Sequence, residues 1–195
     1  MKNVYMIGDM VRYCTDANIG YGIFVMEELE GEAYVYSPQD DCRSAQYTLR
    51  HLHLWADCGY LKPEEIDVVH WNNGLWDCVR IMDDDPIVPI AVYQQQLVRV
   101  YKRITQLFPN AKVIFGTTTP VVERKYGLER HRNSDIEEYN RAAIEVLVPL
   151  GVKINDLYAT AARFDESLYR TYEYFSIEGA KILGRQVADA MRSCF

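Results

Sequence analysis

Several features that mark particular classes of protein are missing from this sequence of 195 residues. No apolar run approaches the ~18 residues that a membrane-spanning helix needs, so we expect no membrane contact. The N-terminus holds one lysine and no long apolar stretch that ends at a small-residue cleavage site, so a secretory signal is not expected.

A surplus of basic charge is also missing. The chain has 21 Lys and Arg against 28 Asp and Glu, a formal net charge of −7, and its basic residues are scattered among acidic ones. Proteins that bind a nucleic-acid backbone need clustered positive charge. The composition therefore argues against DNA or RNA as a partner.

Motifs for cofactors and metals are missing as well. The five cysteines are odd in number and include no Cys-x-x-Cys, which argues against a disulfide framework and a structural zinc site. Gly20-Tyr21-Gly22 lacks the third glycine of a dinucleotide-binding turn, and the three aspartates at 83–85 are typical of a solvated loop. We expect no cofactor, no bound metal and reduced thiols in a cytoplasmic protein.

The composition that remains is that of a globular protein. Hydrophobic residues make up 49% and charged residues 25% of the chain, close to the usual proportions. At about 100–200 residues per domain, this length predicts a single domain that spans residues 1–195.

Strands and helices are predicted to alternate along the chain. The predicted strands lie at residues 4–7, 33–36, 66–70, 112–115 and 151–156, and the helices lie at 18–29, 47–55, 90–107 and 134–150 and after Ser176. A capping box of Ser134 and Glu137 is expected to start the fourth helix, and residues 121–133 are expected to form an exposed loop or lid.

This alternation implies right-handed crossovers and a parallel sheet that is covered on both faces. The sequence therefore predicts the α/β class, as a flavodoxin-like three-layer α/β/α domain with a five-stranded parallel sheet in the order 2-1-3-4-5. Ligands of such sheets bind beyond the carboxyl ends of the strands. Asp9, Met10 and Arg12 follow the first strand, so they are expected at a site.

Five motifs at the predicted strand ends resemble those of the SGNH hydrolases, also called GDSL-type esterases or acylhydrolases. They are Ile-Gly-Asp at 7–9, Trp-Asn-Asn-Gly-Leu-Trp-Asp at 71–77, Thr-Thr-Thr-Pro at 117–120, Ile-Asn-Asp-Leu-Tyr at 154–158 and Phe-Ser-Ile-Glu-Gly-Ala at 175–180. The resemblance covers nearly the whole chain and implies the same fold and a history of ester hydrolysis.

The resemblance also implies which positions would carry the chemistry. In the family, Ser and His perform acyl transfer, Asp orients the His, and backbone amides with an Asn side chain hold the oxyanion. Here the Ser position is Met10, and the Asp and His positions are Thr171 and Tyr174. The oxyanion Gly falls near Cys42, and the oxyanion Asn corresponds to Asn73. The whole triad is therefore replaced.

Each candidate residue also has a purely structural interpretation. Met10 shapes a binding pocket or fills space left by lost polar groups, and Tyr174 donates to a ligand or packs over the helix that follows it. Asn73 binds an oxygen or bonds its own turn, while His70 is a base or a structural histidine. Cys14 and Cys42 either form a thiol-based site or are buried, inert thiols.

The leading hypothesis is a non-catalytic protein that binds a small ligand, acylated or carbohydrate, or a protein partner. One alternative is a weak esterase that uses activated water, with Asp9 or His70 as the base and Asn73 in the oxyanion hole. Another is a regulatory or structural subunit. The ligand-binding and oxyanion candidates are Asp9, Met10, Arg12, Cys42, Asn73, Trp76, Thr117 and Tyr174.

Overall fold

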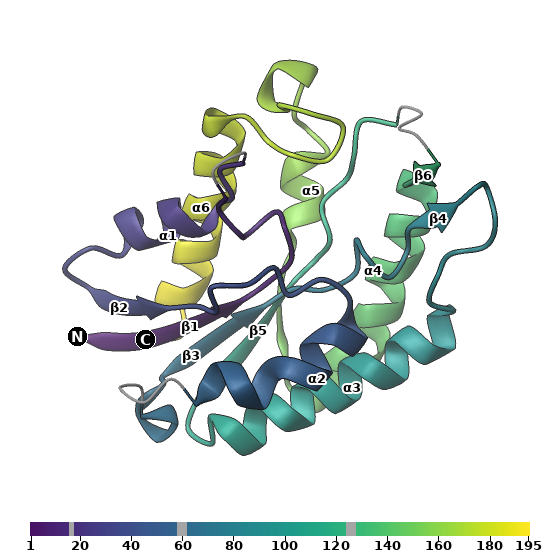
Figure 1. The fold of residues 1–195 in the computed structure, drawn as a ribbon. Helices are drawn as coiled ribbons and strands as arrows, with labels where there is room; N and C mark the ends of the chain where they lie inside the picture. The colour runs from purple at the N-terminus through teal and green to yellow at the C-terminus, as the bar shows by residue number, and fades with distance from the viewer. Residues whose placement is uncertain (16–17, 58–61, 124–127) are drawn as a thin grey trace.

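The computed structural model of the protein describes residues 1–15, 18–57, 62–123 and 128–195. Its centre is a five-stranded parallel sheet in the order β2-β1-β3-β5-β7 (Figure 1). Counted along the chain, these strands have the predicted order 2-1-3-4-5, which is confirmed. The strands are β1 Lys2–Ile7, β2 Ala33–Tyr36, β3 Val68–Trp71, β5 Lys112–Gly116 and β7 Lys153–Asn155.

Helices cover both faces of this sheet, which gives the three layers (Figure 1). On one face α1 (Gly22–Glu28) packs against α6 (Ile177–Arg192), and α5 (Leu157–Ala161) also contacts α6. On the other face α3 (Ile90–Leu107) packs between α2 (Ala45–Ala56) and α4 (Asn133–Leu147). Three short 3₁₀ helices complete the helical segments described, at η1 Pro63–Glu65, η2 Val148–Leu150 and η3 Glu166–Leu168.

The helix boundaries follow from local chemistry at several places. The predicted span of α3 is confirmed: its buried residues Tyr93, Leu97, Val100 and Ile104 recur at helical spacing and face the sheet. Ser176 caps α6 as predicted, because its hydroxyl accepts a hydrogen bond from the Gly179 amide at 3.3 Å.

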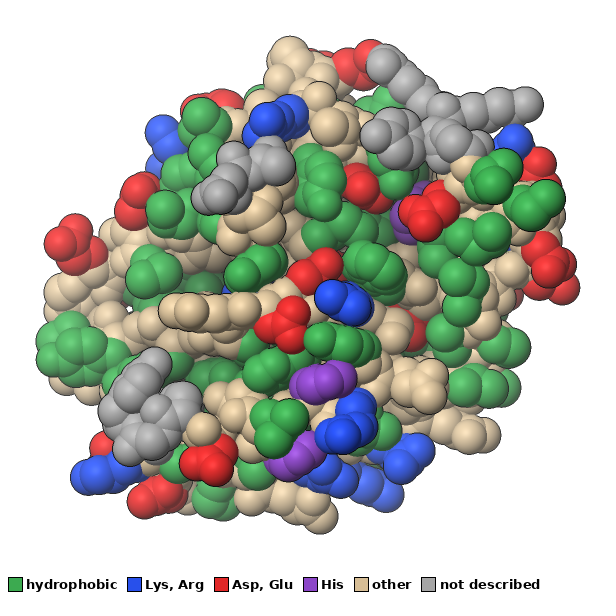
Figure 2. All heavy atoms as spheres, in the orientation of Figure 1, with side chains coloured by type: hydrophobic (Ala, Val, Ile, Leu, Met, Phe, Trp, Pro, Cys, Tyr) green, Lys and Arg blue, Asp and Glu red, His purple; other side chains and the backbone are tan. Residues whose placement is uncertain are grey.

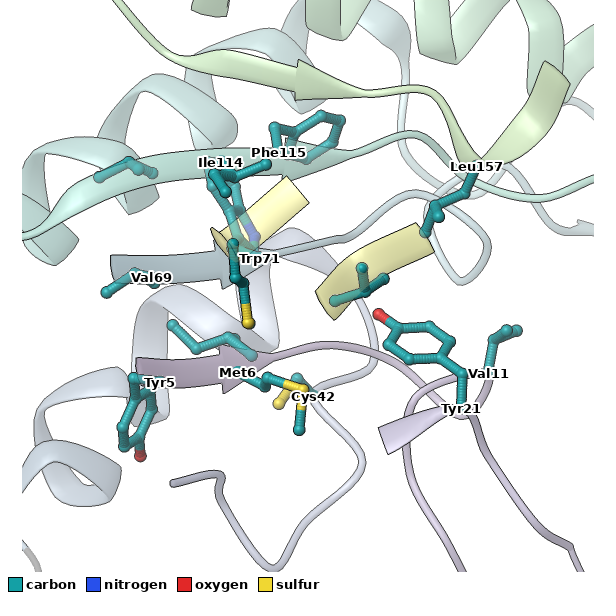
Figure 3. Close-up of a cluster of buried hydrophobic side chains, with 14 of the residues drawn as sticks. Tyr5, Met6, Val11, Tyr21, Cys42, Val69, Trp71, Ile114, Phe115 and Leu157 are labelled. Atoms are coloured by element: carbon teal, nitrogen blue, oxygen red, sulfur yellow. The ribbon is translucent and has the colours of Figure 1, made fainter. Parts of the chain in front are cut away.

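The core lies on both sides of the three central strands. The side chains of β1, β3 and β5 point into it, among them the fully buried Trp71 and Phe115, whose ring centroids are 4.9 Å apart (Figure 3). Tyr5 packs on Phe108 with 5.0 Å between the ring centroids. In the described part of the chain, no helix is both long and apolar enough to cross a membrane.

Two predicted features are wrong in detail. The capping box does not form: α4 begins after Arg132, and Glu137 instead accepts a hydrogen bond from the Tyr158 hydroxyl. The predicted lid over 121–133, whose residues 124–127 lie outside the described part, contains the short strand β6 (Glu129–Arg130), which pairs antiparallel with β4 (Arg80–Ile81). Both differences arise because contacts with distant segments decide the local structure.

The close packing of α6 on α1 depends on Gly184, which a substitution can test. A methyl group at Gly184 would lie 2.7 Å from the Phe24 Cβ and 3.1 Å from the Tyr21 carbonyl oxygen. Alanine raises helix propensity by ~1 kcal/mol, yet we expect Gly184→Ala to lower the free energy of unfolding by about 1–3 kcal/mol because the helices must separate. Urea denaturation measures this loss. Asp189→Ala, on the exposed side of α6, is the control, and a more stable Gly184→Ala variant would refute the packing argument.

Candidate functional site

The turn after β1 is held by close contact with the end of β3. A Cβ atom at Gly8 would lie 2.2 Å from the Asn72 side-chain oxygen and 2.9 Å from the Arg12 Cβ, so only glycine fits there. The Asp9 carbonyl accepts hydrogen bonds from the amides of Arg12 and Tyr13 at 3.0 and 3.1 Å. The chain therefore turns tightly, and Met10 is partly exposed between buried neighbours.

Asp9 lies beneath this turn. Its side chain accepts a hydrogen bond from the Val11 amide at 3.1 Å, and it also bonds the Asn72 side chain. Burial, with a smaller contribution from the charge of Asp41, raises the pKa of Asp9 to about 7. The Tyr21 hydroxyl donates to the Asn72 oxygen at 2.9 Å, which extends the buried network. Asp9 is only 1% exposed, so it has little access to a ligand.

Arg12 and Cys42 connect the turn to the loop that precedes α2. The buried Arg12 guanidinium donates to the carbonyl oxygens of Gly8, Pro38 and Asp40. The Cys42 amide donates to the Gly8 carbonyl at 3.1 Å, and burial raises the pKa of the Cys42 thiol to about 11. In this structure both candidates are structural, and the Cys42 amide is not free to hold an oxyanion.

The two other strand-end candidates are also occupied by structural hydrogen bonds. The Asn73 side chain is fully buried; its oxygen accepts from the Trp71 indole at 2.6 Å, and its nitrogen donates to the Arg43 carbonyl at 2.8 Å and the Thr48 hydroxyl at 3.0 Å. The Thr117 hydroxyl donates to Asp156 at 2.9 Å and accepts from the Tyr158 amide at 2.9 Å. Both hydrogens of the Asn73 amide are therefore used, so it offers no oxyanion donor here.

His70 does not reach any site. It is fully buried, and its Nε2 accepts a hydrogen bond from the Asn155 side chain at 3.2 Å. Burial lowers the pKa of His70 to about 3, so the ring stays neutral. A buried neutral ring without access to solvent is a poor general base, so the burial of His70 favours its structural interpretation.

Met10, Trp76 and Tyr174 meet in a pocket of about 270 Å³. Met10 and Tyr174, which the resemblance predicts at the positions of the family's Ser and His, thus line one cavity although they are far apart in sequence. The described residues that complete its lining are Val79, Ile81, Ile87, Glu129, His131 and Glu173. Exposed hydrophobic side chains also gather beside it, over β4 and β6, including Met82 at 71% and Leu128 at 64% exposure (Figure 2).

A tight turn presents Tyr174 to this pocket. The Thr171 hydroxyl accepts from the Tyr174 amide at 3.1 Å, and the Tyr174 carbonyl accepts from the Arg170 amide at 2.8 Å. Burial and the neighbouring Glu173 raise the pKa of Tyr174 to about 12. Thr171 is exposed and holds the turn, whereas Tyr174 forms part of the pocket wall.

Sequence reasoning missed three residues. Asn72, rather than Asn73, bonds Asp9, and the pattern Trp-Asn-Asn does not distinguish the two amides. His131 and Glu173 line the pocket, but they lie in charged segments without a periodic pattern. Only the folded chain brings these two residues together.

Among the described residues, no three His, Cys, Asp or Glu side chains are grouped as they would need to be to hold a metal ion.

Solved structures that are named as lipases, lipolytic proteins or esterases match this chain along nearly its whole length. The lipase/acylhydrolase from Enterococcus faecalis matches with a TM-score of 0.73 and 20% identity, over 99% of this chain and 96% of that one. A member of the lipolytic protein G-D-S-L family from Veillonella parvula matches with a TM-score of 0.71 and 16% identity, over 98% and 99%. The acetyl xylan esterase AlAXEase matches with a TM-score of 0.69 and 16% identity, over 98% of each chain.

No family model and no curated protein sequence matches the chain. The structural neighbours define the class, which is a three-layer α/β/α protein with the architecture of GDSL-type lipases and esterases. The chain has the SGNH-hydrolase fold, as its strand-end motifs indicated.

The raised pKa of Asp9 makes stability depend on pH. The ordinary pKa of aspartate is 3.8, and that of folded Asp9 is about 7. Between these two pH values the folded state binds the Asp9 proton more tightly than the unfolded state does, so the free energy of unfolding falls as the pH rises. We expect Asp9→Asn to remove roughly 2–3 kcal/mol of the stability that the wild type loses between pH 5 and pH 8, because about two units of the pKa shift lie within this range.

Urea denaturation at the two pH values measures this difference. Asp77, whose pKa burial also raises to about 7, keeps part of the pH dependence in the variant. Asp57→Asn, at an exposed position, is the control. Equal pH dependence in wild type and Asp9→Asn would show that Asp9 ionises freely in the folded protein.

Proposed function

We propose that this protein binds a small organic ligand in the pocket between Met10 and Tyr174 and does not hydrolyse it by acyl transfer. The observation that carries the proposal is that these two residues share one cavity. The family resemblance puts a nucleophile and its base at these positions. A thioether has no proton to lose, and a tyrosine whose pKa is raised to about 12 stays protonated near neutral pH.

The remaining pocket wall supports the same proposal. Its described residues include no serine, threonine or cysteine, so among them no aliphatic hydroxyl or thiol is available for acyl transfer. Thr171, at the position of the orienting carboxylate, has no charge and holds a turn through its hydroxyl. The largely apolar walls still suit a small ligand, because most ligand sites combine apolar walls with a few polar groups.

Hydrolysis by an activated water is the second candidate, since His131 and Glu173 both line the pocket. A side chain there that accepts a proton could activate water without a covalent intermediate. The assays below separate this candidate from binding alone.

We expect no measurable turnover of chromogenic acetyl and butyryl esters and no labelling by covalent serine-hydrolase probes, because the site lacks an activated hydroxyl. The esters are assayed by absorbance and the labelling by mass spectrometry, with Glu173→Gln as the paired variant. Turnover that falls in Glu173→Gln would favour the water mechanism. Stoichiometric labelling of Ser44 or Ser176 would mean that the nucleophile has been misplaced.

Restoring the triad tests whether the family geometry persists. Met10→Ser alone is expected to stay inactive, because a hydroxyl without a base is a poor nucleophile. The triple variant Met10→Ser, Thr171→Asp and Tyr174→His is expected to gain ester hydrolysis, since triad members act as a unit and their effects are strongly non-additive. An aspartate at 171 can still accept the bond from the residue 174 amide, so the turn is preserved.

Steady-state ester assays compare the single, double and triple variants after thermal unfolding has checked that each is folded. If the triple variant is folded but inactive, Cys42→Gly is added as a fourth substitution. It removes a side chain beside the Gly8 carbonyl. If that variant is inactive too, the geometry of the pocket has diverged beyond these positions. Hydrolysis by Met10→Ser alone would contradict the argument that a base is missing.

A further inference from the structure

Two buried hydrogen-bond acceptors in the pocket wall have no partner. His131 is 7% exposed and Glu173 is 8% exposed, and both line the cavity with Met10 and Tyr174. The His131 Nδ1 and the Glu173 Oε2 atoms are buried without a hydrogen bond. Most buried polar atoms in folded proteins are paired, and of the six unpaired atoms among the described residues these are the two whose residues both line this pocket, which suggests a ligand that pairs them.

The tautomer of His131 follows from its other nitrogen. Nε2 lies 2.9 Å from the Leu75 carbonyl oxygen, which can only accept, so Nε2 carries the hydrogen. Burial lowers the pKa of His131, which keeps the ring neutral. The orphaned Nδ1 is therefore a lone pair that needs a donor from the ligand.

The orphaned oxygen of Glu173 makes the same demand. Burial raises the pKa of Glu173, while a hydrogen bond with the Tyr172 side chain favours its charged form. A second carboxylate, Glu129, also lines the pocket. Both groups favour a donor, and the carboxylates favour a donor that is positively charged.

The neighbouring basic side chains do not neutralise this charge within the pocket. Arg130 pairs with Asp83, and Arg80 pairs with Asp135 at 2.6 Å. Arg43 lies over the rings of Tyr47 and Trp76 and is not part of the pocket lining. Among the described residues, no lysine or arginine lines the cavity beside these acidic groups.

We infer that this pocket binds a primary ammonium group on a short alkyl chain, whose N–H groups donate to Glu173 and to the neutral ring of His131. The inference rests on the proposed function, which supplies the binding pocket. Its apolar wall, formed by Met10, Ile81 and Ile87, receives the alkyl chain. The aromatic faces of Trp76 and Tyr174 add attraction for a cation. At about 270 Å³ the cavity suits a small ligand.

Isothermal titration calorimetry with n-pentylammonium tests the inference against three other probes. n-Pentanol has the same chain and a neutral donor, pentanoate carries the opposite charge, and tetramethylammonium is a cation without an N–H group. We expect n-pentylammonium to bind about tenfold or more tightly than each, because charge-assisted hydrogen bonds are about twice as strong as neutral ones. Equal binding of n-pentanol would indicate a hydroxyl ligand instead, and equal binding of tetramethylammonium would eliminate the role of the N–H groups.

Glu173→Gln tests the carboxylate at nearly constant shape. We expect it to weaken n-pentylammonium binding by about tenfold or more, whereas Glu30→Gln, an exposed charge-matched control, leaves binding unchanged. Trp76→Ala is a second variant, at a residue that is 38% exposed, and should also weaken binding. Unchanged affinity in a folded Glu173→Gln protein overturns the inference.

The two proposals fail in different assays. Ester turnover would overturn the non-catalytic function, whereas ammonium binding would still be measurable by calorimetry. Absence of n-pentylammonium binding in a protein without ester turnover would overturn the ligand class alone.

Discussion

The contact between the end of β1 and the end of β3 is the constraint on which the site depends. Gly8 lies so close to Asn72 and Arg12 that no side chain fits at its position. This contact places the buried Asp9 carboxyl beneath the turn, where its bond with Asn72 helps to offset the cost of burial. Met10 consequently emerges at the carboxyl edge of the sheet, in the place where an open α/β fold presents its ligand site.

The strand-end polar groups are mostly committed to holding loops. Arg12 bonds three carbonyl oxygens, and Asn73 joins β3 to the loop and helix around Arg43 and Thr48. Such buried networks stabilise a loop only when every group is paired. The His70 Nδ1 atom at the end of β3 has no partner, and neither have one atom each of His131 and Glu173, which line the pocket beside apolar walls. These two residues line the same pocket as Met10 and Tyr174.

Much of the fold could be predicted because its signals are local and repeated. The apolar spacing of α3 and the Ser176 cap of α6 lie within single segments, so sequence reasoning found both. The capping box failed because Glu137 bonds Tyr158, which lies 21 residues away. The partners of the Asn73 amide were hidden from the sequence for a similar reason, since they lie 25 and 30 residues away.

The sequence by itself determined the class of fold, because strand and helix periodicity can be read directly, and it supplied the prediction that Met10, Thr171 and Tyr174 replace a Ser-His-Asp triad. The tertiary structure decided which groups face the ligand. Parallel strands bring Met10 to the same pocket as Tyr174, and the β4–β6 segment adds His131 from a part of the chain without a regular pattern. Pairing and burial depend on distant neighbours, so only the folded chain shows which buried polar atoms have no partner.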